Sequence, residues 1–547
     1  MPRRIPLLLI LSASVFGQTA LPILPDVQTA MTELRKERFR AHMAFLADDL
    51  LEGRGTGTRG HELAARYTAA QFEALGLLPA GSAGTYYQRV PLLEMSVDAK
   101  KSEVFVIRDG TESRLEWGRD FIMLGNPANA DSSVEAPVTF VGYGVSQPSR
   151  GYDDYVGADV KGKIVAFLDG APGSLQTELR AHVGANQEKL RVARDHGAIG
   201  AIGLRLPESD NLLPWERSVI GATFPTMRWI GPDGHTSDTY PEIRSRAILS
   251  LGASEKLFEH AAKSWAEVLR DAHAAKPQSF LMPFRARLHE VSQFSKITSP
   301  NVIACLPGSD PKLKQEYVIL SAHLDHLGIG PAIHGDTIYN GAVDDASGVA
   351  ALLNIADAFV ALPRAPARSI LFLATTGEEK LGVGADYFVH FPTVPFQSIV
   401  TDINMDWASV LYTFDEVVAM GAADSTLDQV VNSDVSRLGL RVIPDPAPEE
   451  LSFIHGDQYS FVKRGVPSLL MAEGLKARDP KVDATKLQDQ YGTHYHAPSD
   501  DMNQPLDFDA AVEFMQINFL VGYDVAQQPE RPRWKPGDFF GETFSNK

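Results

Sequence analysis

The spacing of hydrophobic residues changes along the chain and predicts a different structure in successive segments. Between residues 33 and 79, apolar residues recur at helical spacing, which predicts two amphipathic helices joined by a turn rich in Gly and Thr, with Gly76 ending the second. Short alternating runs over residues 83–130 predict strands near a domain boundary. Residues 133–255 hold three β-rich runs with a helical segment between the last two, a pattern typical of a small α/β module.

From residue 298 onward, continuous apolar runs alternate with helical patterns, and a helix over residues 507–526 closes the series. Runs of this kind predict an α/β fold in which a mostly parallel sheet is flanked by helices, with the β-rich α/β module as a smaller inserted domain. Polar clusters follow several of the predicted strands. Ligands of such sheets bind beyond the carboxyl ends of the strands, so we expect the functional site there.

The chain has 547 residues, more than a single hydrophobic core usually organises. We therefore predict several segments with distinct roles. They are a signal peptide (1–17), an N-terminal part of the main domain (18–132), an inserted domain (133–255), a linker with a returning strand (256–297), the main catalytic domain (298–530) and a C-terminal tail (531–547).

The N-terminal segment has the layout of a secretory signal. Arg3 and Arg4 precede an apolar run over residues 5–11, and small residues follow, with cleavage expected near Gly17. A buried N-terminal helix is the alternative interpretation of the same residues. We predict an exported protein, periplasmic or extracellular, and no stable membrane insertion, because no later stretch approaches ~18 uninterrupted apolar residues.

Charge and cysteine content narrow the choice of partners. Acidic residues number 69 and basic residues 51, so the net charge is −18, which repels nucleic acid. Cys305 is the single cysteine, so no internal disulfide can form, and its place in an apolar run predicts a buried core thiol. Nothing in the sequence predicts the oligomeric state.

Five separate strand ends carry side chains that could bind metal or move protons. Singly, each has an ordinary interpretation: a hydrogen-bonded histidine, a helix cap or a charged turn. Together, carboxylates and imidazoles at five converging strand ends favour a zinc site, with manganese or cobalt as substitutes in vitro. We expect the Asp325 carboxylate to hold the His323 imidazole. The candidates are His323 and Asp325, Asp344 and Asp345, Glu378 and Glu379, Asp406, and His494 and His496.

These motifs resemble those of the co-catalytic di-zinc aminopeptidase family, which includes bacterial leucyl aminopeptidases and aminopeptidase Y. The segment LADDLLEGRGTGTRG resembles the N-terminal part of such enzymes, and the middle module resembles a protease-associated domain inserted in some of them. The resemblance implies two zinc ions per chain and peptide substrates. It also implies His323 and Glu379 as terminal ligands of different zincs, Asp344 as the bridging carboxylate, and Asp406 and His496 as the remaining ligands.

The resemblance assigns roles to three further residues. Asp325 matches the residue that orients His323, and Glu378 matches the general base that deprotonates the bridging water. Tyr495 matches a tyrosine that hydrogen-bonds the tetrahedral oxyanion. The adjacent glutamates cannot be told apart from the residues alone, so only the resemblance gives Glu379 to the metal and Glu378 to proton transfer.

Other features leave the substrate open. Trp407 stands where the family that the chain resembles usually has a smaller apolar residue. Gly456 and Gln458 stand at the Ser and His positions of that family's Ser-Asp-His-x-x-Phe segment, in which Asp457 is a weak site candidate. The alternatives are a related metallo-carboxypeptidase or dipeptidase, and a glutaminyl cyclase-like or non-catalytic relative. The inserted module has no catalytic cluster, so we expect it to shape access to the site, with a passive stabilising role as the alternative.

Overall fold

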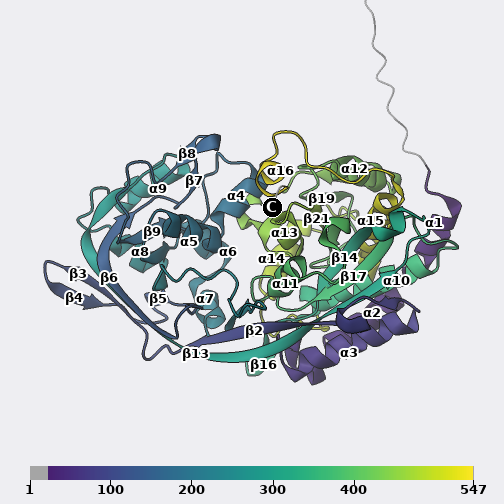
Figure 1. Cartoon of the computed structure of the whole chain (residues 1–547), viewed down its shortest axis with the longest axis horizontal. Helices are drawn as coiled ribbons and strands as arrows, with labels where there is room; N and C mark the ends of the chain where they lie inside the picture. Colours follow the sequence, from purple (N-terminus) through teal and green to yellow (C-terminus); the bar gives the residue numbers. More distant parts are fainter. Residues whose placement is uncertain (1–21, 546–547) are drawn as a thin grey trace, which may run out of the picture.

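One strand, β13 (Phe280–Leu306), runs through both lobes of the molecule (Figure 1). The computed structural model describes residues 22–545, so the predicted signal segment 1–17 lies outside the described residues. β13 pairs antiparallel with β2 (Tyr87–Val97), and the two strands run side by side along the bottom of the view. Of the predicted linker and returning strand (256–297), residues 280–297 belong to this long strand, and the earlier part contains the helix α9 (Trp265–His273).

The larger lobe is built around four parallel strands. They lie in the spatial order β17 (Ser369–Thr375), β14 (Tyr317–His323), β18 (Ile399–Asn404) and β21 (Ser468–Glu473). Antiparallel neighbours close the two sides, β13 next to β17 and β19 (Glu416–Met420) next to β21. The predicted α/β class is confirmed, and the sheet as a whole is mixed, with its parallel part at the centre.

Helices cover both faces of this sheet because its strands are apolar on both sides. On one face, Val318 and Leu320 of β14 pack into the core beneath α2, α3, α10 and α15. On the other face, Ile319 packs with Phe388 and Phe461 of α11 and α13. These helices span Lys36–Leu46 (α2), Arg59–Ala74 (α3), Ser347–Val360 (α10), Val383–His390 (α11), Gln458–Val462 (α13) and Phe508–Gln527 (α15).

The helices predicted near the N-terminus and at the end of the main domain are confirmed. α3 ends at Ala74, where Gly76 has a φ of +75°, a conformation that side chains other than glycine rarely adopt. α15 covers the predicted closing segment. No helix of residues 22–545 is both long and apolar enough to cross a membrane.

The smaller lobe contains the predicted α/β module and some residues from outside its predicted limits. Its parallel strands are β6, β9, β10 and β12, with α5 between β9 and β10. Two strands from before residue 133, β3 and β5, also pair with this sheet. The sequence did not predict these pairings, because a short alternating run indicates a strand but not its partner. The bounds are Glu103–Arg108 (β3), Phe121–Ile122 (β5), Asp131–Phe140 (β6), Ile164–Leu168 (β9), Asn186–Asp195 (α5), Gly200–Leu204 (β10) and Arg246–Leu249 (β12).

A buried arginine fastens the N-terminal segment to the loops around the predicted site. Arg54, 1% exposed, donates hydrogen bonds to the carbonyl oxygens of four residues at 2.6 to 3.0 Å: Leu46, Leu324, Asn340 and Gly341. Next to it, Gly53 has a φ of +64°, and a Cβ there would lie 2.3 Å from the Tyr339 carbonyl oxygen. A residue with a side chain would therefore displace this loop.

Arg54→Met should destabilise the fold strongly. The substitution leaves four carbonyl oxygens without their donor, and each buried unsatisfied group costs about 1–3 kcal/mol, so we expect a loss of roughly 3 kcal/mol or more. Thermal and urea unfolding of the purified proteins measure the change. Arg59→Met, on a side chain that is 71% exposed, is the matched control. Equal unfolding midpoints for the two variants would contradict this role of Arg54.

Candidate active site

Most of the predicted metal-binding side chains meet at the carboxyl ends of the central parallel strands. His323 is the last residue of β14, Glu379 follows β17, and Asp406 follows β18. Asp344 lies in the short turn before α10, and His496 follows α14 (Ala484–Gly492). The strand order brings these segments to one edge of the sheet, as expected for an open α/β sheet.

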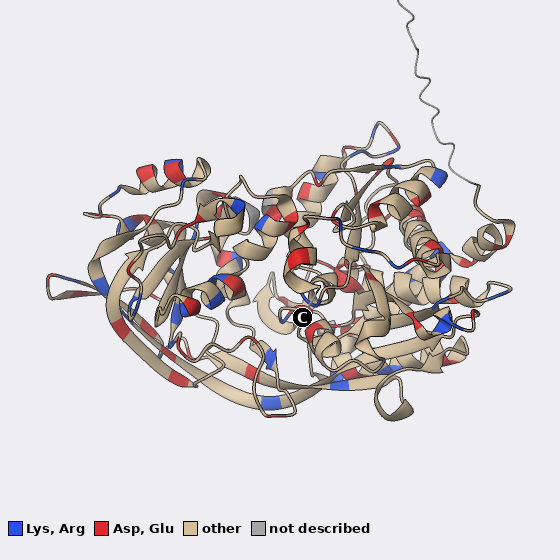
Figure 2. Ribbon diagram, turned by 45° about the horizontal axis from the view of Figure 1, so that its top comes forward, with Lys and Arg blue, Asp and Glu red and all other residues tan. Residues whose placement is uncertain are grey.

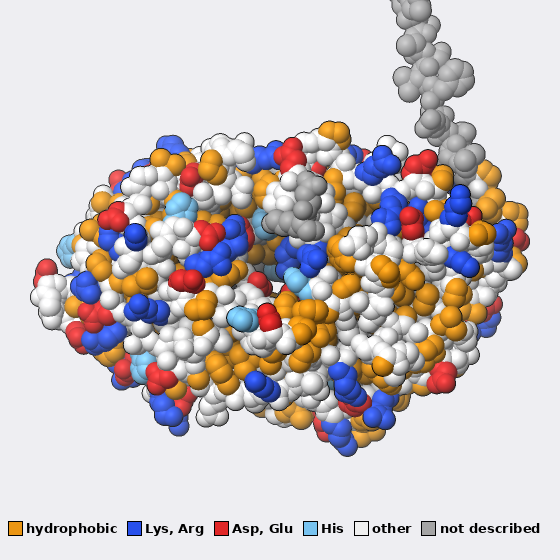
Figure 3. Space-filling view, in the orientation of Figure 1, with side chains coloured by type: hydrophobic (Ala, Val, Ile, Leu, Met, Phe, Trp, Pro, Cys, Tyr) orange, Lys and Arg blue, Asp and Glu red, His pale blue; other side chains and the backbone are white. Residues whose placement is uncertain are grey.

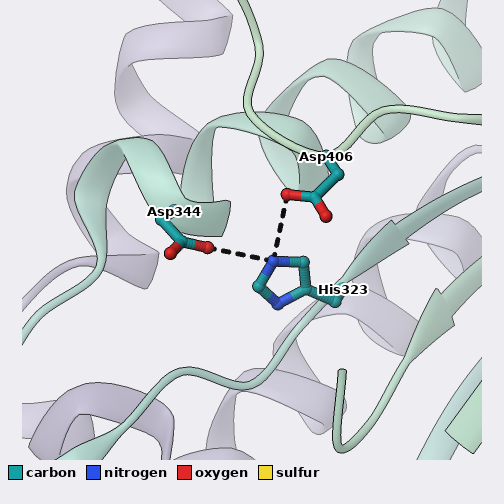
Figure 4. Close-up of side chains that lie close together, drawn as sticks. All are labelled: His323, Asp344 and Asp406. Carbon is teal, nitrogen blue, oxygen red and sulfur yellow. Dashed lines mark ion pairs between the residues drawn. The ribbon is translucent and has the colours of Figure 1, made fainter. Parts of the chain in front are cut away.

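The first of two side-chain groups contains His323, Asp344 and Asp406 (Figure 4). His323 Nε2 lies 3.0 Å from Asp344 Oδ1 and 3.4 Å from Asp406 Oδ1. Both carboxylates point at the same ring nitrogen from different elements. One imidazole and two carboxylates on a common centre form a ligand set that zinc accepts.

The second group shares Asp344 with the first and adds Glu379 and two histidines. Asp344 Oδ2 lies 3.2 Å from His496 Nε2, which also lies 3.2 Å from Glu379 Oε2. His326 Nδ1 lies 2.6 Å from Glu379 Oε1 and 3.8 Å from Asp344 Oδ2. Asp344 therefore presents one oxygen to each group, the arrangement that a carboxylate bridging two cations requires.

The buried polar atoms of both groups fit a bound cation. His323 Nε2, His326 Nδ1 and Glu379 Oε1 are buried, and although each lies close to an oppositely charged group, none makes a hydrogen bond among residues 22–545. Buried polar groups in proteins are normally satisfied, so such a cluster of orphaned atoms requires an explanation. These nitrogens and oxygens are donors that zinc prefers, and their convergence supplies that explanation.

The titration behaviour of the cluster also indicates a need for positive charge. Burial favours the neutral forms, but the neighbouring carboxylates raise the pKa of His323 well above its usual value and that of His496 to about 10. Burial likewise opposes ionisation of Asp344 and Glu379, yet the facing histidines lower the pKa of both carboxyl groups. The carboxylates are thus held ionised only where cationic partners face them.

Buried aspartates position the ligands through the backbone. The Asp345 carboxylate accepts hydrogen bonds from the N–H groups of His323 (3.1 Å), Gly348 (2.8 Å) and Trp407 (3.0 Å). It therefore holds together the end of β14, the first turn of α10 and the segment after β18. Asp500 accepts from the N–H groups of Val343 (3.0 Å) and Asp344 (3.1 Å), which fixes the turn that carries the shared carboxylate.

Asp325 differs from its expected role. The atom that faces His323 Nδ1 is the backbone carbonyl oxygen of Asp325, at 3.0 Å, whereas the Asp325 carboxylate is 4.0 Å from Nδ1. That carboxylate accepts hydrogen bonds from the Thr56 hydroxyl (2.7 Å) and the Glu378 N–H (3.1 Å). Residue spacing correctly placed Asp325 beside His323. It could not predict that the imidazole would hydrogen-bond the main-chain carbonyl oxygen of Asp325 instead of its carboxylate.

Glu378 and Tyr495 lie next to the two groups. The Glu378 N–H is fixed by Asp325, its side chain is half-buried, and burial raises the pKa of its carboxyl group well above the usual range. The Tyr495 ring stacks on His496 with a centroid distance of 3.9 Å. The Trp407 ring centroid lies 4.2 Å from that of Tyr491 and 6.4 Å from that of Tyr495. Trp407 therefore packs beside the ring of Tyr495.

Two weaker candidates do not join the groups. His494 hydrogen-bonds Ser499 Oγ at 2.9 Å and belongs to neither metal-binding group. Asp457 is buried and accepts a hydrogen bond from the Thr375 hydroxyl at the end of β17. Burial raises the pKa of Asp457 to about 7. Asp457 therefore supports the end of the strand that precedes Glu378.

Sequence reasoning missed two residues of the site. His326 stands in the SAHLDHLG motif, and its position three residues after His323 was the signal that could have identified it. Arg217, on α7 (Trp215–Gly221) of the smaller lobe, donates to the carbonyl oxygens of Thr493 (2.7 Å), Tyr495 (2.7 Å) and His496 (3.2 Å). No sequence pattern marks this contact, because it joins segments that lie far apart in the chain.

A cavity of about 290 Å³ adjoins the second group and is walled by both lobes. Glu379, Lys380 and His496 line it from the larger lobe, and Phe224 and Ile248 are among the apolar residues from the smaller lobe. Figure 3 shows a hollow between the lobes with histidine and acidic side chains near its rim. In Figure 2 several ribbon segments of acidic residues lie near the middle of the molecule, where the lobes meet.

Comparison with solved structures shows the fold that carries this site. An aminopeptidase from Aneurinibacillus sp. strain AM-1 is similar, with a TM-score of 0.54 and 17% identity over 94% of this chain and 99% of that one. A peptidase M28 precursor from Shewanella amazonensis SB2B (TM-score 0.47, 16% identity, 93% and 98% covered) and the zinc aminopeptidase BSAP from Bacillus subtilis (0.44, 15%, 92% and 98%) are less similar. No curated protein matches the chain in sequence.

The family model described as Peptidase family M28 matches residues 301–521. The matched region contains the ends of β14, β17 and β18 and every residue of the two metal-binding groups. The match to peptidase family M28 over residues 301–521, with both metal-binding groups inside it, supports a metallopeptidase, and the fold is the one expected from the resemblance to the di-zinc aminopeptidases.

Proposed function

We propose that this metallopeptidase is an exported aminopeptidase that removes N-terminal residues from peptides with two zinc ions per chain. The observation that carries the proposal is the shared carboxylate of Asp344, which presents one oxygen to each of two ligand groups. The solved relatives described as aminopeptidases support the choice of activity. Export rests on the N-terminal sequence pattern alone.

His323 and Asp406 would hold one ion, Glu379 and His496 the other, and Asp344 both. When bound, two such ions lower the pKa of a shared water and polarise the scissile carbonyl group. His326 contacts Glu379 and lies beside the second group, so it either completes the coordination there or holds Glu379 in place. With either role, the second group has two histidines, His326 and His496, whereas the first has only His323.

Glu378 moves the proton in the proposed reaction. Water adds to the carbonyl carbon, and the proton that it loses passes to the Glu378 carboxylate. The same proton then passes to the leaving amine nitrogen as the C–N bond breaks, so a new carboxylate and a free amine are formed. Burial raises the pKa of Glu378, which makes its carboxylate a stronger proton acceptor. Tyr495 lies beside His496, where its hydroxyl can donate to the oxyanion.

A panel of substrates tests the proposed activity directly. The zinc-loaded protein should hydrolyse amino-acid p-nitroanilides and peptides with a free N-terminus. It should leave N-acetylated peptides uncleaved, because the site is expected to require the free amine. Cleavage measured by chromatography separates this outcome from the alternatives. Equal cleavage of N-blocked peptides from their C-terminal end would instead indicate a carboxypeptidase, and loss of all hydrolysis a non-catalytic protein.

The adjacent glutamates should respond differently to the same substitution. Glu378→Gln keeps the shape but removes the basic site, so kcat should fall by roughly 10²-fold or more with zinc content preserved. Glu379→Gln should instead lower zinc content, because Glu379 contacts both histidines of the second group. Each variant is the control for the other in kinetics and metal analysis. If Glu378→Gln lost zinc and regained turnover with added metal, the two roles would have to be exchanged.

Arg217 should affect the metal centre although it lies on the smaller lobe. Arg217→Met removes three donors from the segment that carries His496, so we expect zinc to bind the second group roughly 10- to 100-fold more weakly. Competition with a chelator measures this affinity. Arg244→Met, on an exposed arginine of the same lobe, is the control. Equal affinities for both variants would show that the smaller lobe does not support the site.

A further inference from the structure

The cavity beside the second metal-binding group contains one cation that lacks a partner. Arg246 lies on β12 of the smaller lobe and lines the cavity together with Ile248 of the same strand. Within residues 22–545, its guanidinium group makes no hydrogen bond, and no acidic side chain lies within 4.0 Å of it. A charge in such an apolar setting is costly unless a ligand compensates it.

The other two cations of the cavity are already engaged. The Arg217 guanidinium group donates hydrogen bonds to the carbonyl oxygens of the segment that carries His496. The Lys380 ammonium lies 5.6 Å from the centre of the Phe224 ring and within the field of Glu379 and Asp325. Arg246 is therefore the cavity cation that remains available for an anionic group of a ligand.

The surroundings of Arg246 leave its charge uncompensated. Burial and the nearby Arg228 lower the pKa of Arg246 to about 10, although the negative charge of Glu290 acts in the opposite direction. Burial raises the pKa of the Glu290 carboxyl group to about 7. Glu290 is therefore protonated in part near neutral pH. A second, smaller hollow beyond Arg246 is lined by Arg228 and Asp238, and neither arginine forms an ion pair with Asp238. Two arginines, Arg228 and Arg246, thus face one acidic residue, Asp238, in this hollow.

The rest of the wall restricts what can reach Arg246. Phe167, Leu190, Ile220, Phe224 and Ile248 line the cavity, so it accepts apolar side chains. A planar guanidinium group binds a carboxylate with two parallel hydrogen bonds. The cavity thus offers metal ligands at one end, a carboxylate-binding group in its wall and an apolar surface between them.

We infer that Arg246 binds the C-terminal carboxylate of a short, apolar peptide whose N-terminal residue lies at the metal centre. This assignment rests on the proposed function and deepens it, since the enzyme would recognise both ends of its substrate. The smaller lobe would then select peptides by length, because the carboxylate reaches Arg246 only when the peptide spans the cavity. An acidic side chain could supply the same carboxylate, and the apolar wall favours the C-terminus.

Leucine peptides of two, three and four residues, each as the free acid and as the C-terminal amide, test the inference. In the zinc-loaded wild type, kcat/KM should favour the acid by about 10-fold or more at one length, mainly through KM. Arg246→Met should remove this preference, and Arg244→Met should keep it. Equal rates for acid and amide at every length would overturn the inference while leaving the aminopeptidase proposal intact. An amidated peptide with an internal Glu tests whether a side chain can replace the terminal carboxylate, and faster cleavage than its Gln counterpart would overturn the assignment to the C-terminus.

A binding measurement keeps the test independent of turnover. Peptides whose first amide is reduced to a methylene amine cannot be hydrolysed, and calorimetry should show that the wild type binds the acid about 10-fold more tightly than the amide. If the wild type cleaves no substrate but retains this difference, the proposed activity fails and the carboxylate site stands. Arg246→Lys serves where Arg246→Met does not fold. It keeps the charge without the paired donors, so it should show a reduced acid preference, and an unchanged preference would overturn the role of the guanidinium group.

Discussion

The structure depends on placing several carboxylates and histidines within about 3 Å of one another at one edge of a sheet. In a low dielectric, such a cluster repels itself and leaves polar atoms unsatisfied unless cations enter it. Asp344 is the centre of this constraint, because its two oxygens face different histidines. Two ions sharing Asp344 would satisfy the orphaned atoms of both groups and supply the positive charge that keeps the carboxylates ionised.

Much of the fold serves to hold these groups before any ion arrives. Arg54 ties the N-terminal segment to the loops after β14 and before α10, and Asp345 and Asp500 fix the backbone on either side of Asp344. The smaller lobe contributes as well, since Arg217 holds the segment of His496. These contacts are hydrogen bonds to main-chain atoms, so they fix the position of each ligand without competing for its metal-binding atoms.

The sequence predicted the α/β class, the principal helices and the strand ends because buried strands and amphipathic helices have distinct periodicities. It also identified His323, Asp344 and Asp406, which the structure brings into one group. It did not predict the placement of β3 and β5 in the smaller lobe, since alternation identifies a strand but not its partner. His326 was overlooked although its position three residues after His323, in the same motif, could have identified it. The positions of Arg217 and Arg246 beside the site could not be predicted, because they depend on contacts between segments far apart in the sequence. The partner of His323 is a main-chain carbonyl group, which residue identity does not specify.

We propose that Asp344 would bridge two zinc ions in the loaded protein. Anomalous diffraction from crystals of the zinc-loaded protein, recorded on both sides of the zinc absorption edge, tests it most directly. We expect two peaks roughly 3.5–4 Å apart, one beside His323 and Asp406 and the other beside Glu379 and His496, with Asp344 between them. A single peak at full zinc loading, or two peaks of which only one contacts Asp344, would contradict the bridging role of Asp344.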